Sequence, residues 1–285
     1  MAAVTTAKAA MRRAMGGIRL VLPLSARRRI VRALGGRAWV PHRHALAMEL
    51  LRDVWAADPA ALHRFLWANH LAYAESYAVE GRFGEEAVVP SRRMLFEDLR
   101  DHLVGAGIDP ERDVASVFEV GCSLGYLLRH LETGLFRSAR TLEGIDIDRQ
   151  AIRDGAAYLA SIGSRVGVAA ADTSELSSIL AGRTIDVILC AGVLMYLPED
   201  EARLVVDSIL RHTGIVAAFA GLAHPAIDNA DLAHSEVRAG DGSFIHNIDA
   251  MVQAAGGTVA RRRWEGPRNV GGNTIYFVFA VPPGA

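Results

Sequence analysis

The segment Val117–Leu128 places the strongest constraint on how this chain can fold. Its first residues, up to Val120, include three strand formers around a single glutamate, and Gly121 and Gly125 allow the backbone to turn tightly. Helical spacing resumes at Tyr126. A strand that leads through a glycine turn into a helix presents unpaired backbone N–H groups at the edge of a sheet. The segment therefore predicts a binding site for a small molecule.

Two common nucleotide-binding patterns are excluded. The dinucleotide spacing G-x-G-x-x-G requires glycine at 121, 123 and 126, whereas the chain has Gly121, Ser123 and Tyr126. The P-loop requires a lysine next to its glycine turn, and the only lysine of the chain is Lys8. The turn is therefore suited to a ligand other than a dinucleotide or a nucleoside triphosphate.

From Ser116 onward, apolar strands alternate with amphipathic helices, a pattern that predicts a doubly wound α/β fold with a parallel sheet. After the strand that ends at Val120, the expected strands are Thr141–Ile145, Arg165–Ala170, Ile185–Ala191, Ile215–Leu222, Thr258–Trp264 and Thr274–Val281. The expected helices are Ser91–Val104, Gln150–Leu159, Ser174–Leu180, Glu199–Arg211 with Gly214 as its cap, and Asn247–Ala255.

The glycine turn resembles motif I of the class I S-adenosylmethionine (SAM) dependent methyltransferases. The resemblance is carried by Glu119, Gly121, Ser123 and Gly125, which form the pattern acidic-x-Gly-x-Ser-x-Gly. SAM carries no phosphate, so the lack of a phosphate-binding glycine pattern agrees with this family.

Further points of resemblance follow in register. Asp146 ends the second strand, where a carboxylate can accept hydrogen bonds from both ribose hydroxyls. Asp172 follows the third strand, at the family's acidic position near the adenine, and it is equally suited to cap a helix. The segment Asp186–Leu197 resembles the strand and loop beside the transferred methyl group.

The resemblance implies a Rossmann-like, doubly wound, seven-stranded sheet that ends in an antiparallel hairpin, with SAM as the cofactor. It also implies a cofactor site made of the residues at the strand exits. These are Glu119, Gly121, Cys122, Ser123, Gly125, Asp146, Ile147, Asp172, Thr173, Cys190 and Ala191.

Candidate acceptor-side residues follow the fourth and fifth strands. The connection 223–246 is too long for a plain loop and is expected to bind the substrate. His224, directly after the fifth strand, is the first candidate for a general base and His246 the second, although each also has a structural interpretation. Tyr196 is expected to lie beside the methyl group. Asp228 and His234 are further candidates for substrate contact.

A metal site is not expected. Asp228-Asn229 could mimic half of the cation site of the catechol-type methyltransferases, but the exit of the fourth strand, Ala191-Gly192-Val193, contains no carboxylate. Two hard oxygen ligands without a third make a poor cation site.

The beginning of the chain differs in charge from the rest. The whole chain has 31 Lys and Arg against 32 Asp and Glu, yet residues 1–48 hold ten of the basic residues and none of the acidic ones. We expect residues 1–90 to form a basic helical extension and lid, and residues 91–285 to form the SAM-binding domain. Within the extension, Leu66, His70, Tyr73 and Tyr77 are spaced to share one helical face, and Tyr73 and Tyr77 are candidates for substrate contact.

Several roles for the basic extension stay open. It can be a transit peptide, lie on a membrane surface, or pack on its own subunit or on a second copy in a homodimer. It can also bind an acidic partner such as a carrier protein or nucleic acid. No apolar run is long enough to span a membrane, and two cysteines indicate a reducing compartment. The arginine-rich composition is typical of a bacterial protein, and we expect a cytoplasmic location.

Three functions fit these observations. The first is a methyltransferase that acts on oxygen, nitrogen or carbon of a small, specialised metabolite in a biosynthetic reaction. The second is an RNA or protein methyltransferase that docks through the basic extension, although the acidic body of the chain is a poor nucleic-acid surface. The third is a SAM-binding domain without catalytic activity.

Overall fold

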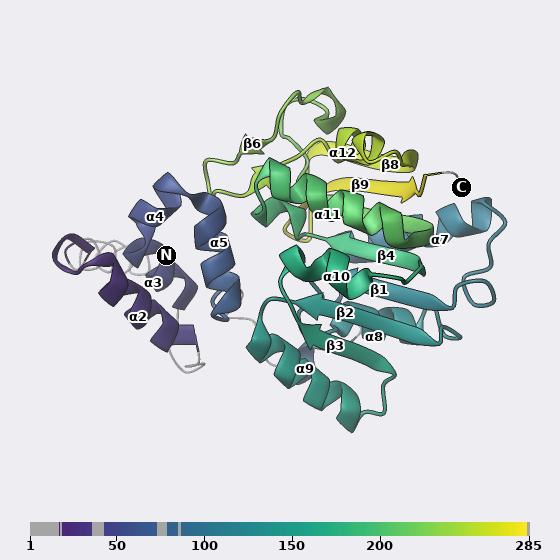
Figure 1. The fold of residues 1–285 in the computed structure, drawn as a ribbon, viewed down its shortest axis with the longest axis horizontal. Helices are drawn as coiled ribbons and strands as arrows, with labels where there is room; N and C mark the ends of the chain where they lie inside the picture. Colours follow the sequence, from purple (N-terminus) through teal and green to yellow (C-terminus); the bar gives the residue numbers. More distant parts are fainter. Residues whose placement is uncertain (1–16, 18, 36–42, 73–78, 85–86, 284–285) are drawn as a thin grey trace. The chain divides into compact units, whose positions relative to one another are not determined.

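The computed structural model describes residues 17, 19–35, 43–72, 79–84 and 87–283 (Figure 1). The chain divides into two compact units. One comprises Met1–Tyr77 with Asp148–Gln150, and the other comprises Ala78–Ile147 with Ala151–Ala285. The predicted substrate residues Tyr73 and Tyr77 lie outside the described residues.

The first unit is helical. Its longer described helices are α2 (Leu24–Gly35), α3 (Arg43–Leu50), α4 (Arg52–Ala57) and α5 (Pro59–Ala68). They pack around a small apolar core that includes Val31, Leu50 and Leu62, each at most 3% exposed. The Asp58 carboxylate caps α5 by accepting a hydrogen bond from the backbone N–H of Ala61 at 2.9 Å.

The predicted face shared by Leu66 and His70 is wrong, because α5 ends at Ala68 and His70 has a left-handed backbone with φ 58°. The residue that follows the helix packs closely against α2. The Asn69 carbonyl lies so close to Gly35 of α2 that a Cβ at Gly35 would be 2.0 Å from its oxygen.

The second unit is built on a seven-stranded sheet with the order β3-β2-β1-β4-β5-β9-β8. The strands β1 to β5 run parallel to one another. The strand β9 runs antiparallel to both of its neighbours, β5 and β8. The predicted doubly wound sheet with an antiparallel terminal hairpin is therefore confirmed. The strands are β1 (Ser116–Val120), β2 (Thr141–Asp146), β3 (Val166–Ala170), β4 (Ile185–Ala191), β5 (Thr213–Gly221), β8 (Thr258–Val270) and β9 (Asn273–Val281).

Helices cover both faces of the sheet (Figure 1). One apolar layer joins α7 (Pro90–Gly105), α8 (Tyr126–Thr133) and α9 (Arg149–Ser161) to the sheet. The opposite layer joins α10 (Leu176–Leu180), α11 (Glu199–His212) and α12 (Ile248–Ala254). Further elements are α6 (Val79–Arg82), η2 (Thr173–Glu175), η3 (Leu194–Tyr196), η4 (Asn229–Asp231), β6 (Glu236–Val237) and β7 (Phe244–Ile245).

The predicted cap at Gly214 is wrong, because Gly214 lies inside β5. The cap of α11 is Thr213, whose hydroxyl donates a hydrogen bond to the Ile209 carbonyl at 2.8 Å. Gly214 instead serves close packing, since a Cβ there would lie 3.1 Å from the Thr184 side chain. Among the described residues, no helix combines the length and the apolar character that crossing a bilayer requires.

Candidate functional site

The glycine turn after β1 connects the exits of three strands. The backbone N–H groups of Gly121 and Cys122 both donate to the Ile145 carbonyl of β2, at 2.8 and 2.9 Å. Gly121 has φ 79°, and a Cβ there would lie 2.1 Å from Cγ2 of Val193, which follows β4. This position therefore requires glycine for both its backbone angle and its surroundings.

The last residue of β2 is oriented by this turn. Asp146 is 7% exposed, and its Oδ2 accepts a hydrogen bond from the backbone N–H of Ser123 at 2.8 Å. Ser123 has a left-handed backbone with φ 52°, an uncommon conformation for a residue other than glycine. The structure thus brings the predicted ribose-binding carboxylate together with the glycine turn.

Glu119 is the most unusual titratable group of the site. It lies in β1, is 2% exposed, and its Oε2 has no hydrogen-bond partner. Burial raises the pKa of Glu119 to about 8; nearby Arg92 opposes this shift, and the Asp146 charge adds to it. A buried polar atom without a partner is rare in folded proteins and marks a place where a ligand can bind.

The other predicted cofactor residues lie at neighbouring strand exits. Asp172 accepts a hydrogen bond from the Ser174 N–H at 2.9 Å and caps η2, whose first residue is Thr173. Ile147 directly follows β2, and Ala191 is the last residue of β4. Cys190 is fully buried, and burial raises the pKa of its thiol to about 12, so the thiol stays protonated.

Arg92 is a residue of this site that the sequence did not reveal. It belongs to α7, and its Nη2 donates a hydrogen bond to the Ala191 carbonyl at 3.1 Å. Gly192 permits this approach, because a Cβ there would lie 2.7 Å from Arg92 Nη2. In the sequence, Arg92 is one of three arginines in α7, so no local signal distinguishes it.

His224 lies after β5 with both ring nitrogens engaged. Its Nδ1 accepts hydrogen bonds from the backbone N–H groups of Ala226 and Ile227, at 3.1 and 3.0 Å. Its Nε2 is 3.3 Å from a carboxylate oxygen of Glu236. Because Nδ1 accepts, the neutral ring carries its proton on Nε2. The role of His224 as a base stays a prediction, and it requires Nδ1 to leave its two backbone donors.

His246 connects the predicted substrate loop to η3. Its Nε2 donates to the Leu194 carbonyl at 2.8 Å, and its Nδ1 accepts from the Ser235 hydroxyl at 2.6 Å. Burial lowers the pKa of His246 despite several opposing contacts, so the ring is neutral near pH 7. Tyr196 is the last residue of η3, and His246 thereby holds the segment that carries Tyr196.

Asn229 is a second residue that the sequence analysis did not assign to the site. Its Oδ1 accepts from the His224 N–H and from Trp264 Nε1, at 2.8 and 2.9 Å. Its Nδ2 donates to the carbonyls of Leu222 and His246, at 2.9 and 2.7 Å. A single fully buried amide therefore joins the exit of β5, the entry to α12 and the β8 strand.

The two other predicted substrate residues lie on the same loop. Asp228 caps η4 through the Ala230 N–H and forms an ion pair with Arg262 of β8. His234 is exposed. Within the described ranges, no group of three or more His, Cys, Asp or Glu side chains is arranged to hold a metal ion.

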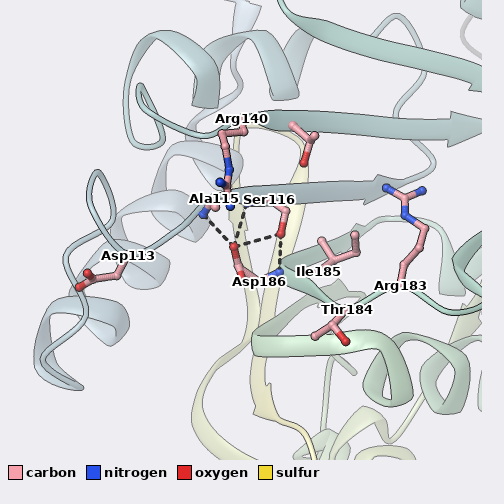
Figure 2. A pocket seen from close by; sticks show the side chains of 9 residues that line it. Asp113, Ala115, Ser116, Arg140, Arg183, Thr184, Ile185 and Asp186 are labelled. Carbon is pink, nitrogen blue, oxygen red and sulfur yellow. Dashed lines mark hydrogen bonds between the residues drawn. The ribbon is translucent and has the colours of Figure 1, made fainter.

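A cavity of about 520 Å³ opens at the opposite end of the strands, where β1, β2 and β4 begin (Figure 2). Asp186 lies at its centre, and its Oδ2 accepts hydrogen bonds from the backbone N–H groups of Ala115 and Ser116, at 2.7 and 2.9 Å. The carboxylate therefore joins the starts of β1 and β4, and Arg183 on the rim is paired with Glu143. Because Asp186 binds backbone groups of the neighbouring strand, we interpret it as a residue that stabilises the sheet.

Comparison with known proteins agrees with this geometry. A family model described as "Methyltransferase domain" matches residues 118–215. No curated protein sequence matches the chain significantly. The magnesium protoporphyrin IX methyltransferase of Synechocystis PCC 6803 with bound SAM is similar in fold, with a TM-score of 0.50 and 16% identity, over 79% of this chain and 97% of that one. The CcbJ methyltransferase of Streptomyces caelestis gives a TM-score of 0.46 and 14% identity, over 65% and 88% of the two chains.

Residues 118–215 match a methyltransferase domain, and the strand order and the glycine turn beside Asp146 agree with the fold of that domain. The residues present suit SAM as a cofactor, since the turn at Gly121 has no room for a side chain, Asp146 is fixed at the exit of β2, and Glu119 offers a buried oxygen without a partner.

Proposed function

We propose that this enzyme transfers the methyl group of SAM to a small metabolite bound above the carboxyl ends of β4 and β5. The observation that carries the proposal is the fixed arrangement of the polar loop at that edge, where Asn229 and His246 anchor the residues that follow both strands. Ligands of open α/β sheets bind at the carboxyl ends of the strands. The Synechocystis protein of similar fold is named for a small-molecule acceptor.

The cofactor would be held by the exits of β1 and β2. SAM supplies an electrophilic methyl group on a positively charged sulfur. Asp146, oriented by Ser123, accepts hydrogen bonds from the ribose hydroxyls, and the glycine turn at Gly121 lets the backbone approach the ligand. By resemblance, Asp172 and Thr173 lie near the adenine.

The protein would accelerate transfer mainly by holding acceptor and methyl group in line. His246 is engaged by Leu194 and Ser235 and acts as a structural residue in this conformation. His224 is the proposed base for a hydroxyl acceptor. An amine, carbon or ionised oxygen acceptor needs no such base, and for these His224 would only shape the loop.

A screen of candidate acceptors tests the proposal. The purified enzyme is incubated with SAM and small-molecule, RNA or protein fractions, and methylated products are identified by mass spectrometry. We expect methylated small molecules. Transfer to RNA or protein alone would contradict the proposal and favour docking through the basic N-terminal residues.

A further inference from the structure

The cavity where β1, β2 and β4 begin is separate from the predicted cofactor site, which lies at the other end of the same strands (Figure 2). Its volume of about 520 Å³ falls in the range of roughly 300–1,000 Å³ that small-molecule sites occupy. Apart from Ala115 and Ile185, the residues that line it are polar or charged. The cavity therefore suits a small polar ligand better than an apolar one.

Asp186 has one carboxylate oxygen engaged and one open. Its Oδ2 accepts hydrogen bonds from the backbone N–H groups of Ala115 and Ser116 and from the Ser116 hydroxyl, at 2.7, 2.9 and 3.0 Å. Its Oδ1 accepts no hydrogen bond from any residue that the structure describes. The half-buried carboxylate stabilises the sheet through Oδ2 and leaves Oδ1 available to a donor from outside the chain.

Arg140, which directly precedes β2, brings a positive charge to the same cavity. Its backbone N–H donates to the Ala115 carbonyl at 2.7 Å, which fixes this residue beside the start of β1. Figure 2 shows its side chain extending from the start of β2 toward Asp186. Within the described part of the chain, the Arg140 guanidinium forms no hydrogen bond or ion pair, so it is not paired with Asp186. A cation and an anion thus face the same space without contact.

The other charged groups of the cavity have partners within the chain. Arg183 forms an ion pair with Glu143, and Asp113 forms one with the arginine that precedes it in the sequence. Among the described residues that line the cavity, Arg140 and Asp186 therefore offer the two unmatched charges. These charges are of opposite sign, so a simple anion would be repelled by Asp186 and a simple cation by Arg140.

A ligand that carries both an ammonium group and a carboxylate matches the two charges. We propose that the cavity binds a small zwitterion of the α-amino acid class, whose ammonium group donates to Asp186 Oδ1 and whose carboxylate accepts from Arg140. The exposed hydroxyls of Thr141 and Thr184 line the same cavity and can hydrogen bond to the rest of the ligand. The proposal depends neither on the methyl acceptor nor on the proposed function.

A thermal-shift screen of the common L-amino acids against the wild type is the first test. The protein is loaded with one equivalent of S-adenosylhomocysteine (SAH), which keeps the amino acids out of the predicted cofactor site. The amino acid with the largest effect is then titrated by calorimetry, together with its des-amino and amide analogues, each of which lacks one of the two charges.

The same titrations are made with Arg140→Met and Asp186→Asn. The matched control is Arg137→Met, which changes an exposed arginine of the same α8–β2 connection that does not line the cavity. Arg140→Met removes no hydrogen bond or ion pair that the structure describes for that side chain, so unfolding would not account for a loss of binding. Titration of SAH into each variant checks that it is folded.

We expect at least one amino acid to raise the unfolding temperature of the wild type. Its affinity should fall by about ten- to hundredfold in Arg140→Met and in Asp186→Asn, the scale of a lost charge-assisted hydrogen bond. Arg137→Met should bind it as the wild type does. The des-amino and amide analogues should bind the wild type more weakly than the amino acid by a similar factor.

No effect of any amino acid on the wild type would overturn the proposal, as would an affinity that is unchanged in Arg140→Met. Equal binding of the amino acid and its des-amino analogue would show a site for simple anions and would overturn the pairing with Asp186. Equal binding of the amide analogue would overturn the pairing with Arg140.

Discussion

Single residues at the strand exits form the predicted cofactor site. Asp146 and Glu119 are polar residues that the motif predicts, whereas Arg92 and Asn229 become apparent only in three dimensions. The hydrogen bond from Arg92 to Ala191 joins residues 99 positions apart in the sequence. No local pattern encodes such a pairing, because it depends on how α7 packs against the sheet.

Gly121→Ala should weaken SAH binding and destabilise the fold. The new Cβ would lie 2.1 Å from Cγ2 of Val193, and φ 79° costs a residue other than glycine roughly 1–2 kcal/mol. Thermal unfolding and calorimetric titration measure the two effects. Adding Val193→Ala relieves the contact but not the backbone strain, so the double variant should recover part of the loss. A single variant with wild-type affinity and stability would show that the turn tolerates a side chain.

His224→Ala tests the base assignment. If the acceptor is a hydroxyl, turnover should fall by roughly a hundredfold, the usual scale for the loss of a general base. SAH affinity should change little. Full turnover in His224→Ala across the pH range would instead indicate an acceptor that reacts without a base.

For His246→Ala we expect a lower unfolding temperature, since the buried ring joins Ser235 to Leu194.

At the scale of elements, the sequence predicted the sheet, but it did not predict the internal structure of the loop 223–246. Apolar periodicity and the glycine turn located the strands, and the structure confirms the sheet and its terminal hairpin. In the loop after β5, by contrast, η4 and the β6–β7 hairpin are held by the Asn229 side chain and by Ser235. These contacts depend on the tertiary structure, and periodicity carries no information about them.

Glu132, at the junction of α8 and β3, should make the free energy of unfolding depend on pH in the acidic range. Burial alone would raise the pKa of Glu132, but hydrogen bonds from Ser164, Arg129 and Arg165 hold it at about 2. The unfolded value is near 4.3, so this contribution is present above that pH and is lost as the pH falls toward 2.

Glu132→Gln should therefore lower the free energy of unfolding at pH 7 by on the order of 2–3 kcal/mol. Denaturant titrations of both proteins at several pH values measure the difference. It should shrink as the pH falls from about 5 toward 3. A difference that is constant with pH would mean that the Glu132 charge contributes nothing.

At the scale of the whole molecule, we predict that the basic N-terminal residues serve assembly and not cofactor binding. The described part of this region has its own core, to which α2 contributes Val31, and the sheet unit carries the glycine turn and Asp146. Removing residues 1–43 should leave SAH affinity unchanged. It should also change the oligomeric state from the homodimer we predict, as measured by light scattering. A truncated protein of unchanged oligomeric state and full activity would contradict this role.

The central claim is that the exits of β1 and β2 bind SAM, and calorimetric titration of SAH into the wild type and Asp146→Ala tests it most directly. Asp186→Asn is a matched control, because Asp186 lies at the opposite end of the same strands (Figure 2). We predict saturable binding to the wild type, unchanged affinity in Asp186→Asn, and a loss of roughly 1.5–3 kcal/mol in Asp146→Ala. Unchanged affinity in Asp146→Ala, or no binding of SAH to the wild type, would contradict the claim.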